Sequence, residues 1–398
     1  MITCCILRII STLFTLVILT NALAIIGEPV YHFSGNNDGA NPQSTLTQVN
    51  NTGLLFGVTR YGDNSSDNTG VIYRIDTRQN NTFTVVYQFT TSTGCQPISP
   101  LVHDGTIFLF GSTIRCSQFG YGNLFRFNLM NYTLEIIYEF PDIANPIKLL
   151  LDTSSGLLYG VASVGSSTFY GSVFTIDIKQ TKPSTTFKQL FSFDYRTGAF
   201  PSNLILMNHS LYINTEIFGE HGGGTLVKMN QDGKNAKLIY PFGADDALGC
   251  PPWGQLVRVN DEDQQEEYLY GTTMGAANCP STIYRVRLST GIESVEFVAT
   301  LNETTVGRGP FDGLIKDVGS PFCYGVTSDG GMNDRGTMFR FNVSNGTSLE
   351  KLFDFPMDDS FGYETLGGLV QVGNSSFYGA ANLGGKYGFG TIYQITIR

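Results

Sequence analysis

One motif recurs seven times along the chain and constrains its fold more than any other feature. The motif is an apolar residue, an aromatic, a glycine and two small residues, and its copies begin at positions 55, 109, 158, 211, 269, 323 and 377. The copies are therefore 54, 49, 53, 58, 54 and 54 residues apart. A near-constant period of this length is typical of a repeat architecture, in which each repeat is one supersecondary unit.

Each repeat contains four short strand-like runs separated by turns, which we label A to D. Run A follows a D-to-A turn, most often of the pattern G-x-x-P, run B is the motif itself, run C follows a glycine-rich loop, and run D ends in aromatic or apolar residues. Four strands per repeat are typical of β-propeller blades, because a lone sheet of this kind buries its faces only by stacking in a ring. The sequence therefore predicts an all-β fold, a seven-bladed β-propeller of four-stranded blades.

The two ends of the chain predict how this ring closes. Residues 30–33 form a run of type D at the start, and the chain ends on a run of type C that begins at Thr391. The strand at 30–33 is therefore expected to join the last blade. A closed ring leaves none of the exposed strand edges of an open solenoid, and for that reason we favour the ring.

The amino-terminal residues predict export. Ile9–Leu19 is a short apolar run preceded by Arg8 and followed by the small residues of Ala22–Ala24, an arrangement typical of a cleaved signal peptide. The run is shorter than the roughly 20 apolar residues that span a bilayer. We expect a signal peptide at residues 1–24, a single propeller domain at residues 25–398, and a secreted protein with no membrane span after cleavage.

Composition narrows the classes of partner. The chain has 24 Lys and Arg against 34 Asp and Glu, a formal net charge of −10. Nucleic-acid binding depends largely on phosphate neutralisation by Lys and Arg, so we expect no nucleic-acid partner. The glycine-rich loops lead into strands, whereas a phosphate cradle leads into the start of a helix. We therefore expect no bound cofactor. We also expect the protein to be a monomer.

The glycine pattern of the clearest repeats resembles a known family. Gly330-Gly331 is followed by Gly336-Thr337, and Gly384-Gly385 is followed by Gly390-Thr391. This pattern resembles the GloVer tandem repeat of choice-of-anchor secreted proteins, over nearly the whole chain after the signal peptide. The resemblance implies a β-propeller-like architecture and a secreted or surface-displayed location, and it carries over no catalytic residues. It weakens in the fourth repeat, where Ile213 replaces the motif glycine, and in the fifth, which lacks the double glycine.

The cysteines predict two disulfides on one face of the ring. Propeller geometry places the D-to-A and B-to-C loops on one face, here called the first face, and the A-to-B and C-to-D loops on the second face. Cys95 and Cys250 lie in D-to-A loops, and Cys116 and Cys279 lie in the following B-to-C loops. In an exported chain these equivalent placements predict the pairs 95–116 and 250–279. The alternative, metal ligation, lacks a C-x-x-C spacing or a His cluster, so we expect no metal site. The remaining cysteine, Cys323, occupies a position that is Leu or Phe in other repeats and is expected to be buried.

Nine N-x-S/T sequons favour the first face as the working surface. Such sequons are N-glycosylation acceptors in exported proteins. The predicted loops place most of them on the second face, at Asn50, Asn80, Asn131, Asn208, Asn342, Asn345 and Asn374, and place only Asn64 and Asn302 on the first. Because bulky glycans obstruct partners, we expect ligands to approach the first face.

Aromatic and Arg side chains of the first-face loops are the candidate ligand-binding residues, because these types supply most interface energy and stack on sugars. The candidates are Arg60, Tyr61, Arg115, Tyr121, Tyr195, Arg196, Trp253, Arg335, Tyr363 and Tyr387. The leading hypothesis is a secreted, N-glycosylated propeller that acts as a binding or interaction module for glycan or protein ligands.

The alternative is a carbohydrate-active enzyme, a hydrolase or lyase. Paired carboxylates that cleave a glycosidic bond lie about 5 to 9.5 Å apart. Acidic residues of the D-to-A loops are the candidates for such a pair, namely Asp194, Asp245, Asp246, Asp358 and Asp359. The catalytic residues themselves stay unassigned, because the sequence cannot supply the distances.

Overall fold

The structure is a computed structural model that describes most of the chain. The described residues are 23–62, 69–165, 168–244, 247–261, 266–276, 278–288, 293–317, 319–343 and 348–398. Most of the predicted signal peptide, residues 1–22, lies outside them. Within the described residues the regular structure is almost entirely β, with one short 3-10 helix, η1 (Pro183–Thr186).

Seven antiparallel sheets of four strands make up the described structure. The first blade is β2 (Thr47–Val49), β3 (Leu54–Thr59), β4 (Val71–Asp76) and β5 (Thr82–Gln88), and the second is β6 (Val102–His103), β7 (Phe108–Thr113), β8 (Asn123–Asn128) and β9 (Leu134–Glu139). The third blade is β10 (Pro146–Asp152), β11 (Leu157–Ala162), β12 (Ser172–Asp177) and β13 (Lys188–Ser192), and the fourth is β14 (Ala199–Met207), β15 (Ser210–Ile217), β16 (Gly222–Asn230) and β17 (Lys237–Gly243).

The remaining three blades follow the same order. The fifth is β18 (Val257–Asp261), β19 (Glu266–Thr272), β20 (Thr282–Arg287) and β21 (Ser294–Thr300), and the sixth is β22 (Leu314–Lys316), β23 (Phe322–Val326), β24 (Thr337–Asn342) and β25 (Leu349–Asp354). The seventh is β26 (Val370–Val372), β27 (Ser376–Ala381), β28 (Thr391–Ile397) and β1 (Ile25–His32).

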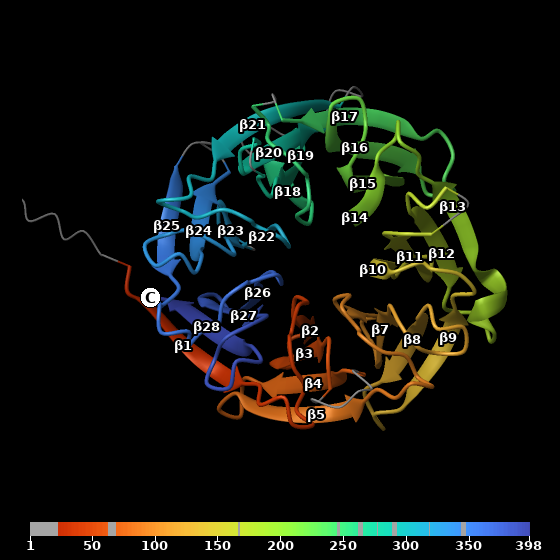
Figure 1. The fold of residues 1–398 in the computed structure, drawn as a ribbon, viewed down its shortest axis with the longest axis horizontal. Coiled ribbons are helices and arrows are strands. Elements are labelled where there is room, and N and C mark those ends of the chain that lie inside the picture. The colour runs from red at the N-terminus through yellow and green to blue at the C-terminus, as the bar shows by residue number, and fades with distance from the viewer. Residues whose placement is uncertain are drawn as a thin grey trace, which may run out of the picture.

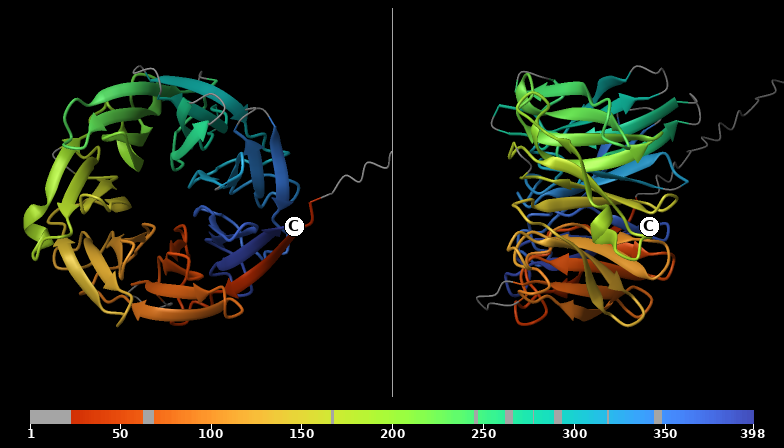
Figure 2. Two further views of the ribbon diagram at one scale, coloured as in Figure 1. Left: turned by 180° about the vertical axis from the view of Figure 1, so that it is seen from behind. Right: turned by 90° about the vertical axis from the view of Figure 1, so that its right-hand side faces the viewer.

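The sheets stand side by side around a ring, with the first strand of each blade nearest the centre (Figure 1). Figure 2 shows the same ring from behind and from the side. The predicted all-β, seven-bladed propeller is confirmed. Strands A to D of each repeat are the first to fourth strands of a blade, from the centre outward.

The last blade combines both ends of the chain. β1 pairs antiparallel with β28, from Ile25 opposite Ile397 to His32 opposite Thr391. This strand begins five residues before the predicted range 30–33, because its ladder with β28 continues outward, with a bulge between Pro29 and Tyr31.

The motif glycines lie directly opposite aromatic residues of the next strand in six blades. The opposed pairs are Gly57 and Tyr73, Gly111 and Phe125, Gly160 and Phe174, Gly271 and Tyr284, Gly325 and Phe339, and Gly379 and Tyr393. A Cβ atom added to any of these glycines would fall 2.2–2.5 Å from an atom of its aromatic partner. The glycine is therefore required because the aromatic ring occupies the space above it.

The fourth blade replaces this glycine–aromatic pair with two aliphatic residues. Ile213 stands where the other motifs have glycine, and the residue opposite it is Val227 instead of an aromatic. Both side chains are buried. The blade thus fills the same space with two branched aliphatic side chains, which explains why the motif is weakest in this repeat.

The core lies between the blades. Each hydrophobic cluster joins two neighbouring sheets; for example, Phe33 and Tyr73 pack with Tyr378 and Ile392 across the contact between the last blade and the first. Cys323 is buried in such a cluster and is unpaired, as predicted. Burial raises the pKa of its thiol to about 12, so it stays protonated at neutral pH.

Transplanting the fourth-blade pair into the second blade tests the role of the glycine. Gly111→Ile overpacks against Phe125, and Phe125→Val leaves a cavity, so we expect each to lower the free energy of unfolding by about 2–3 kcal/mol. The double variant is expected to lose less than the sum by at least ~1 kcal/mol, measured by denaturant unfolding. Phe125→Val combined with Ile213→Val, in a distant blade, is the additive control. Additivity of G111I and F125V would contradict the explanation.

Candidate functional site

A cavity of about 220 Å³ lies at the centre of the ring, and all seven blades contribute to it. Its lining comes from the residues that lead into, or begin, the innermost strands: Gln43, Ser44, Thr45, Ile98, Pro100, Ile147, Lys148, Ser202, Asn203, Trp253, Phe311, Asp312 and Leu366. These residues directly follow the D-to-A loops. The cavity therefore lies toward the first face.

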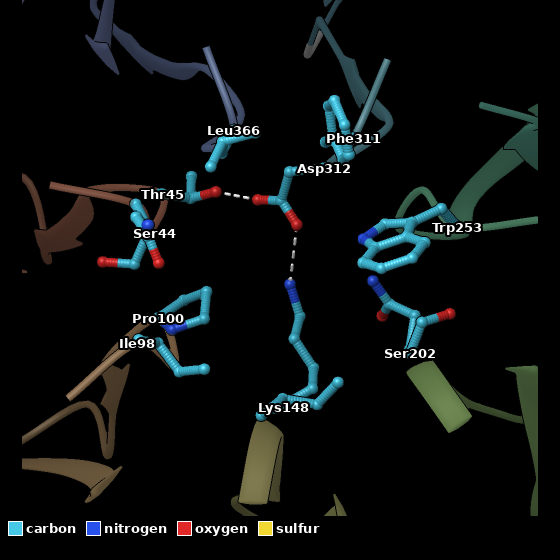
Figure 3. A pocket seen from close by; sticks show the side chains of 13 residues that line it. Ser44, Thr45, Ile98, Pro100, Lys148, Ser202, Trp253, Phe311, Asp312 and Leu366 are labelled. Carbon is cyan, nitrogen blue, oxygen red and sulfur yellow. Dashed lines mark hydrogen bonds and ion pairs between the residues drawn. The ribbon is translucent and has the colours of Figure 1, made fainter. Parts of the chain in front are cut away.

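An ion pair crosses this cavity between opposite sides of the ring. Lys148 of the third blade extends toward Asp312 of the sixth, and its Nζ lies 3.2 Å from Oδ1 of Asp312 (Figure 3). The same ammonium group donates a hydrogen bond to Oε1 of Gln255 at 2.9 Å. Lys148 is only 8% exposed. Because both charges have left bulk water, each depends on the other and on the surrounding hydrogen bonds.

Donors from the first and last blades fix the carboxylate of Asp312. The Thr45 hydroxyl donates to Oδ2, as Figure 3 shows, and the backbone N–H of Gly368 donates to the same oxygen at 3.2 Å. The Gly368 N–H also lies 2.8 Å from the Thr45 hydroxyl oxygen. Asp312 and Lys148 together thus link five blades at the axis.

The rest of the lining combines aromatic rings with hydroxyl and amide groups. Trp253 and Phe311 meet edge to face, with ring centroids 5.8 Å apart. Trp253 lies across the cavity from Ser44 and Thr45 (Figure 3). Ser44 is 3% exposed, and its buried hydroxyl has no hydrogen-bond partner within the described structure. The cavity therefore offers an apolar surface, a neutral ion pair and an unsatisfied hydroxyl.

The first-face loops are held against one another by backbone and side-chain hydrogen bonds. Backbone bridges join D-to-A loops to B-to-C loops, for example Ala40 to Tyr61 and Arg308 to Asp329. In addition, a Thr at or near the start of the third strand donates to a D-to-A carbonyl: Thr225 to Thr197 at 2.7 Å and Thr337 to Val306 at 2.6 Å. These contacts fix the turns from which the cavity residues emerge.

Both predicted disulfides are present on the first face. Cys95 bonds to Cys116, with Cα atoms 5.3 Å apart, and Cys250 bonds to Cys279, with Cα atoms 5.5 Å apart. Each closes one D-to-A loop onto the B-to-C loop of the same blade. A cross-link of this loop length stabilises a fold by about 3 kcal/mol.

Six of the ten candidate ligand-binding residues form Arg–Tyr pairs in three separate places. The Arg guanidinium carbon lies 5.4 Å from the Tyr ring centroid in Arg60–Tyr61, 5.4 Å in Arg196–Tyr195 and 4.9 Å in Arg335–Tyr363. Such cation–π contacts orient the side chains before a ligand arrives.

The other four candidates lie apart from these pairs. Arg115 is exposed, Tyr121 packs against the core of the second and third blades, and Tyr387 is 49% exposed beside Lys386. Trp253 is the one candidate that lines the central cavity. The structure therefore distributes the ten residues around the first face and does not gather them into a single pocket.

Exposed apolar side chains concentrate on the first face. Among the described residues, eight of the thirteen exposed large apolar side chains lie in D-to-A or B-to-C loops: Phe119, Ile143, Phe169, Tyr195, Phe218, Met332, Met357 and Tyr387. The second-face loops contribute only Ile107 and Met130 to the same set.

Most described sequons lie on the opposite face. Asn50, Asn80, Asn131, Asn208 and Asn374 are exposed in second-face loops, and Asn342 is half-buried at the end of β24. Asn302 is exposed on the first face. Asn64 and Asn345 lie outside the described residues.

The described carboxylates that the enzyme hypothesis names form hydrogen bonds or an ion pair within the first-face loops. Asp194 accepts hydrogen bonds from the Thr197 N–H at 2.8 Å and the Arg196 N–H at 3.0 Å. Asp358 accepts from the Ser360 N–H at 3.0 Å, and Asp359 pairs with Arg335 at 2.8 Å. None of the three lines the central cavity. Asp245 and Asp246 lie outside the described residues.

Sequence reasoning missed the polar residues of the cavity. Lys148 interrupts the apolar run of β10, and Asp312 stands in a turn that is otherwise Gly, Pro and Phe. The available signal was a charge at, or just before, the start of an innermost strand, where other repeats have uncharged residues such as Thr45, Gln255 and Gly368.

Glu216, at the first-face end of β15, was also missed. Desolvation by burial raises its pKa to about 8, so the folded protein holds this carboxyl mainly protonated at neutral pH. It does not line the central cavity.

Two features are absent from the described residues. No group of three or more His, Cys, Asp or Glu there has the arrangement to hold a metal ion. In the same part of the chain, no helix has the length and hydrophobicity needed to cross a bilayer.

Comparison with known proteins supports the repeat assignment. Residues 12–174 match the Gloeobacter/Verrucomicrobia repeat. The predicted resemblance to this repeat is therefore confirmed over residues 12–174. No curated protein matches the chain by sequence.

Several solved structures are similar in fold. A putative 6-phosphogluconolactonase from Bacteroides uniformis superposes with a TM-score of 0.53 at 13% identity, over 82% of this chain and 88% of that one. The periplasmic gluconolactonase of Pseudomonas aeruginosa gives 0.52 at 14% identity, over 78% and 84%. A xyloglucanase from Xanthomonas campestris gives 0.56 at 12% identity, over 90% of this chain and 54% of that one. At such low identity the likeness shows the propeller fold alone.

Glu216 predicts a pH dependence of stability. Its pKa in the fold lies above the unfolded value of about 4.5, so the stability that it contributes is complete below that pH and is lost as the pH rises through about 8. Glu216→Gln keeps the neutral form at every pH. We expect its melting temperature to exceed that of the wild type increasingly between pH 5 and 8, by the equivalent of about 4 kcal/mol at the upper end. The exposed neighbour Glu220→Gln is the control, and a pH-independent difference for E216Q would contradict the assignment.

Proposed function

We propose that this protein is a secreted, N-glycosylated propeller that acts as a binding module and holds a glycan or protein ligand on its first face. The observation that carries the proposal is the asymmetry of the ring: exposed aromatic and methionine side chains gather on the first face, whereas the described sequons lie mainly on the second. Exposed apolar side chains of this kind mark interaction surfaces, and aromatic and Arg residues supply most binding energy.

Three features support the proposed location. The two disulfides require an oxidising compartment to form and persist. The apolar run at Ile9–Leu19 has the length and flanking residues of a signal peptide. The repeated sequons are modified only in the secretory pathway, and most are exposed.

Binding is favoured over catalysis by the use of the carboxylates. A glycosidase needs two carboxyl groups on either side of one sugar bond. Here Asp194 and Asp358 cap turns and Asp359 pairs with Arg335. Among the described residues, Asp312 is the single carboxylate that lines the central cavity. The names of the similar lactonases and xyloglucanase support neither interpretation, because the likeness extends only to the fold.

A binding screen with matched variants tests this function. The mature protein is screened on an array of purified glycans, and the bound glycans are also assayed for cleavage. We expect Tyr195→Ala combined with Arg196→Ala to weaken binding about tenfold or more, because it removes one oriented pair from the first face. Ile107→Ala combined with Met130→Ala, exposed on the second face, is the control. Cleavage of a bound glycan would retire the binding-module proposal, as would equal losses in both variants.

A further inference from the structure

We propose that the central cavity is a binding site for a single neutral sugar residue. This inference goes beyond the proposed function, because a free monosaccharide would occupy the cavity whether or not the first-face loops bind a larger ligand. Its basis is the combination of an aromatic surface, a paired cation and anion, and an unsatisfied hydroxyl in one cavity.

The size of the cavity limits the ligand. Pockets for drug-sized molecules measure roughly 300–1,000 Å³, whereas this cavity measures about 220 Å³. One pyranose or furanose ring fills this space, so the rest of a longer chain would extend out of the cavity. Because the lining follows the D-to-A loops, the ring would enter from the first face.

The charges of the cavity select a neutral ligand. Lys148 and Asp312 form a pair whose formal charges cancel, and both side chains are 14% exposed or less. An anionic or cationic ligand would leave one charge uncompensated in a desolvated site, at a large cost. A sugar hydroxyl both donates and accepts, so it can bond to Asp312 and receive a bond from Lys148 without adding charge. Hydrogen bonds to charged groups are the stronger ones.

The remaining groups match the two surfaces of a sugar ring. The C–H face of a pyranose is apolar and packs on an aromatic ring such as Trp253, while its hydroxyl edge needs hydrogen-bonding partners. Ser44 supplies a buried hydroxyl without a partner, and buried hydroxyls are rarely left so. A ligand hydroxyl between Trp253 and Ser44, on opposite sides of the cavity, would satisfy it.

The chain contains its own reporter for this site. Trp253 is the only tryptophan in the sequence, so intrinsic tryptophan fluorescence reports the cavity alone. The mature protein is titrated with glucose, galactose, mannose, xylose and N-acetylglucosamine, and with glucuronate and glucosamine as charged counterparts. Titration calorimetry accompanies each, so that binding without a fluorescence change is also detected. We expect at least one neutral sugar to bind saturably and to shift the emission, and the charged counterparts to bind at least tenfold more weakly.

Variants separate the site from the rest of the first face. Asp312→Asn is expected to weaken binding of that sugar at least tenfold, and Asp232→Asn, an exposed carboxylate of a second-face loop, is expected to leave it unchanged. Because D312N leaves Lys148 without its counter-charge and folding can suffer, Trp253→Leu removes the aromatic surface while keeping the ion pair. Calorimetry should show that W253L also binds the sugar at least tenfold more weakly. Its melting temperature is measured in parallel to check that it folds. Absence of saturable binding by any neutral sugar would overturn the proposal, and the ion pair would then be a structural link between blades. Tighter binding of glucuronate than of the neutral sugars would also overturn it. Neither result bears on the binding of ligands by the first-face loops, which the glycan-array screen measures separately.

Discussion

The glycine–aromatic pair across the second and third strands is the contact on which the ring depends. Each blade must be thin enough to pack against two neighbours, yet must bury large side chains to stabilise a sheet of only four short strands. Placing the ring of Tyr73 or Phe125 over a glycine meets both needs, because the aromatic lies flat on its own sheet. The fourth blade shows that the constraint concerns volume and not glycine itself, since Ile213 and Val227 divide the same space differently.

The position of the cavity follows from the same repeat. Once the third strand is fixed by its aromatic, the Thr at its start is fixed too, and it binds the D-to-A loop through a carbonyl, as Thr337 does with Val306. That loop sets where the innermost strand begins and which residues reach the axis. The disulfides add a covalent restraint in two of these loops. The seven loops thus present their inner residues to a common centre from a rigid frame, which is what a preorganised site requires.

The sequence predicted the architecture well because the architecture is repeated. Strand order, blade count, both disulfides and the burial of Cys323 all follow from comparing equivalent positions within one chain. The cavity could not be found in this way. Lys148 and Asp312 are single departures from the repeat, 164 residues apart, and their meeting depends on two blades facing each other across the ring. Glu216 was hidden for a related reason. Its pKa is raised by burial at the end of β15, and equivalent positions of other repeats hold other polar residues, such as Arg60 and Ser328, so comparing repeats does not reveal that burial.

The ion pair between Lys148 and Asp312 at the axis carries a desolvation cost that blade packing does not require. This cost helps to decide whether the pair is a structural link or part of a binding site. Removing two charges from water is repaid by their attraction only when geometry and surrounding hydrogen bonds are favourable, and apolar replacements are often as stable. The other blades place Thr, Pro, Asn, Gln and Gly near the same level, and the ring closes around them. Blade packing alone therefore gives no reason for Lys148 and Asp312 to meet there. A polar ligand does give one, because charges held in place by Gln255, Thr45 and Gly368 are already oriented toward the hydroxyls that would bind them.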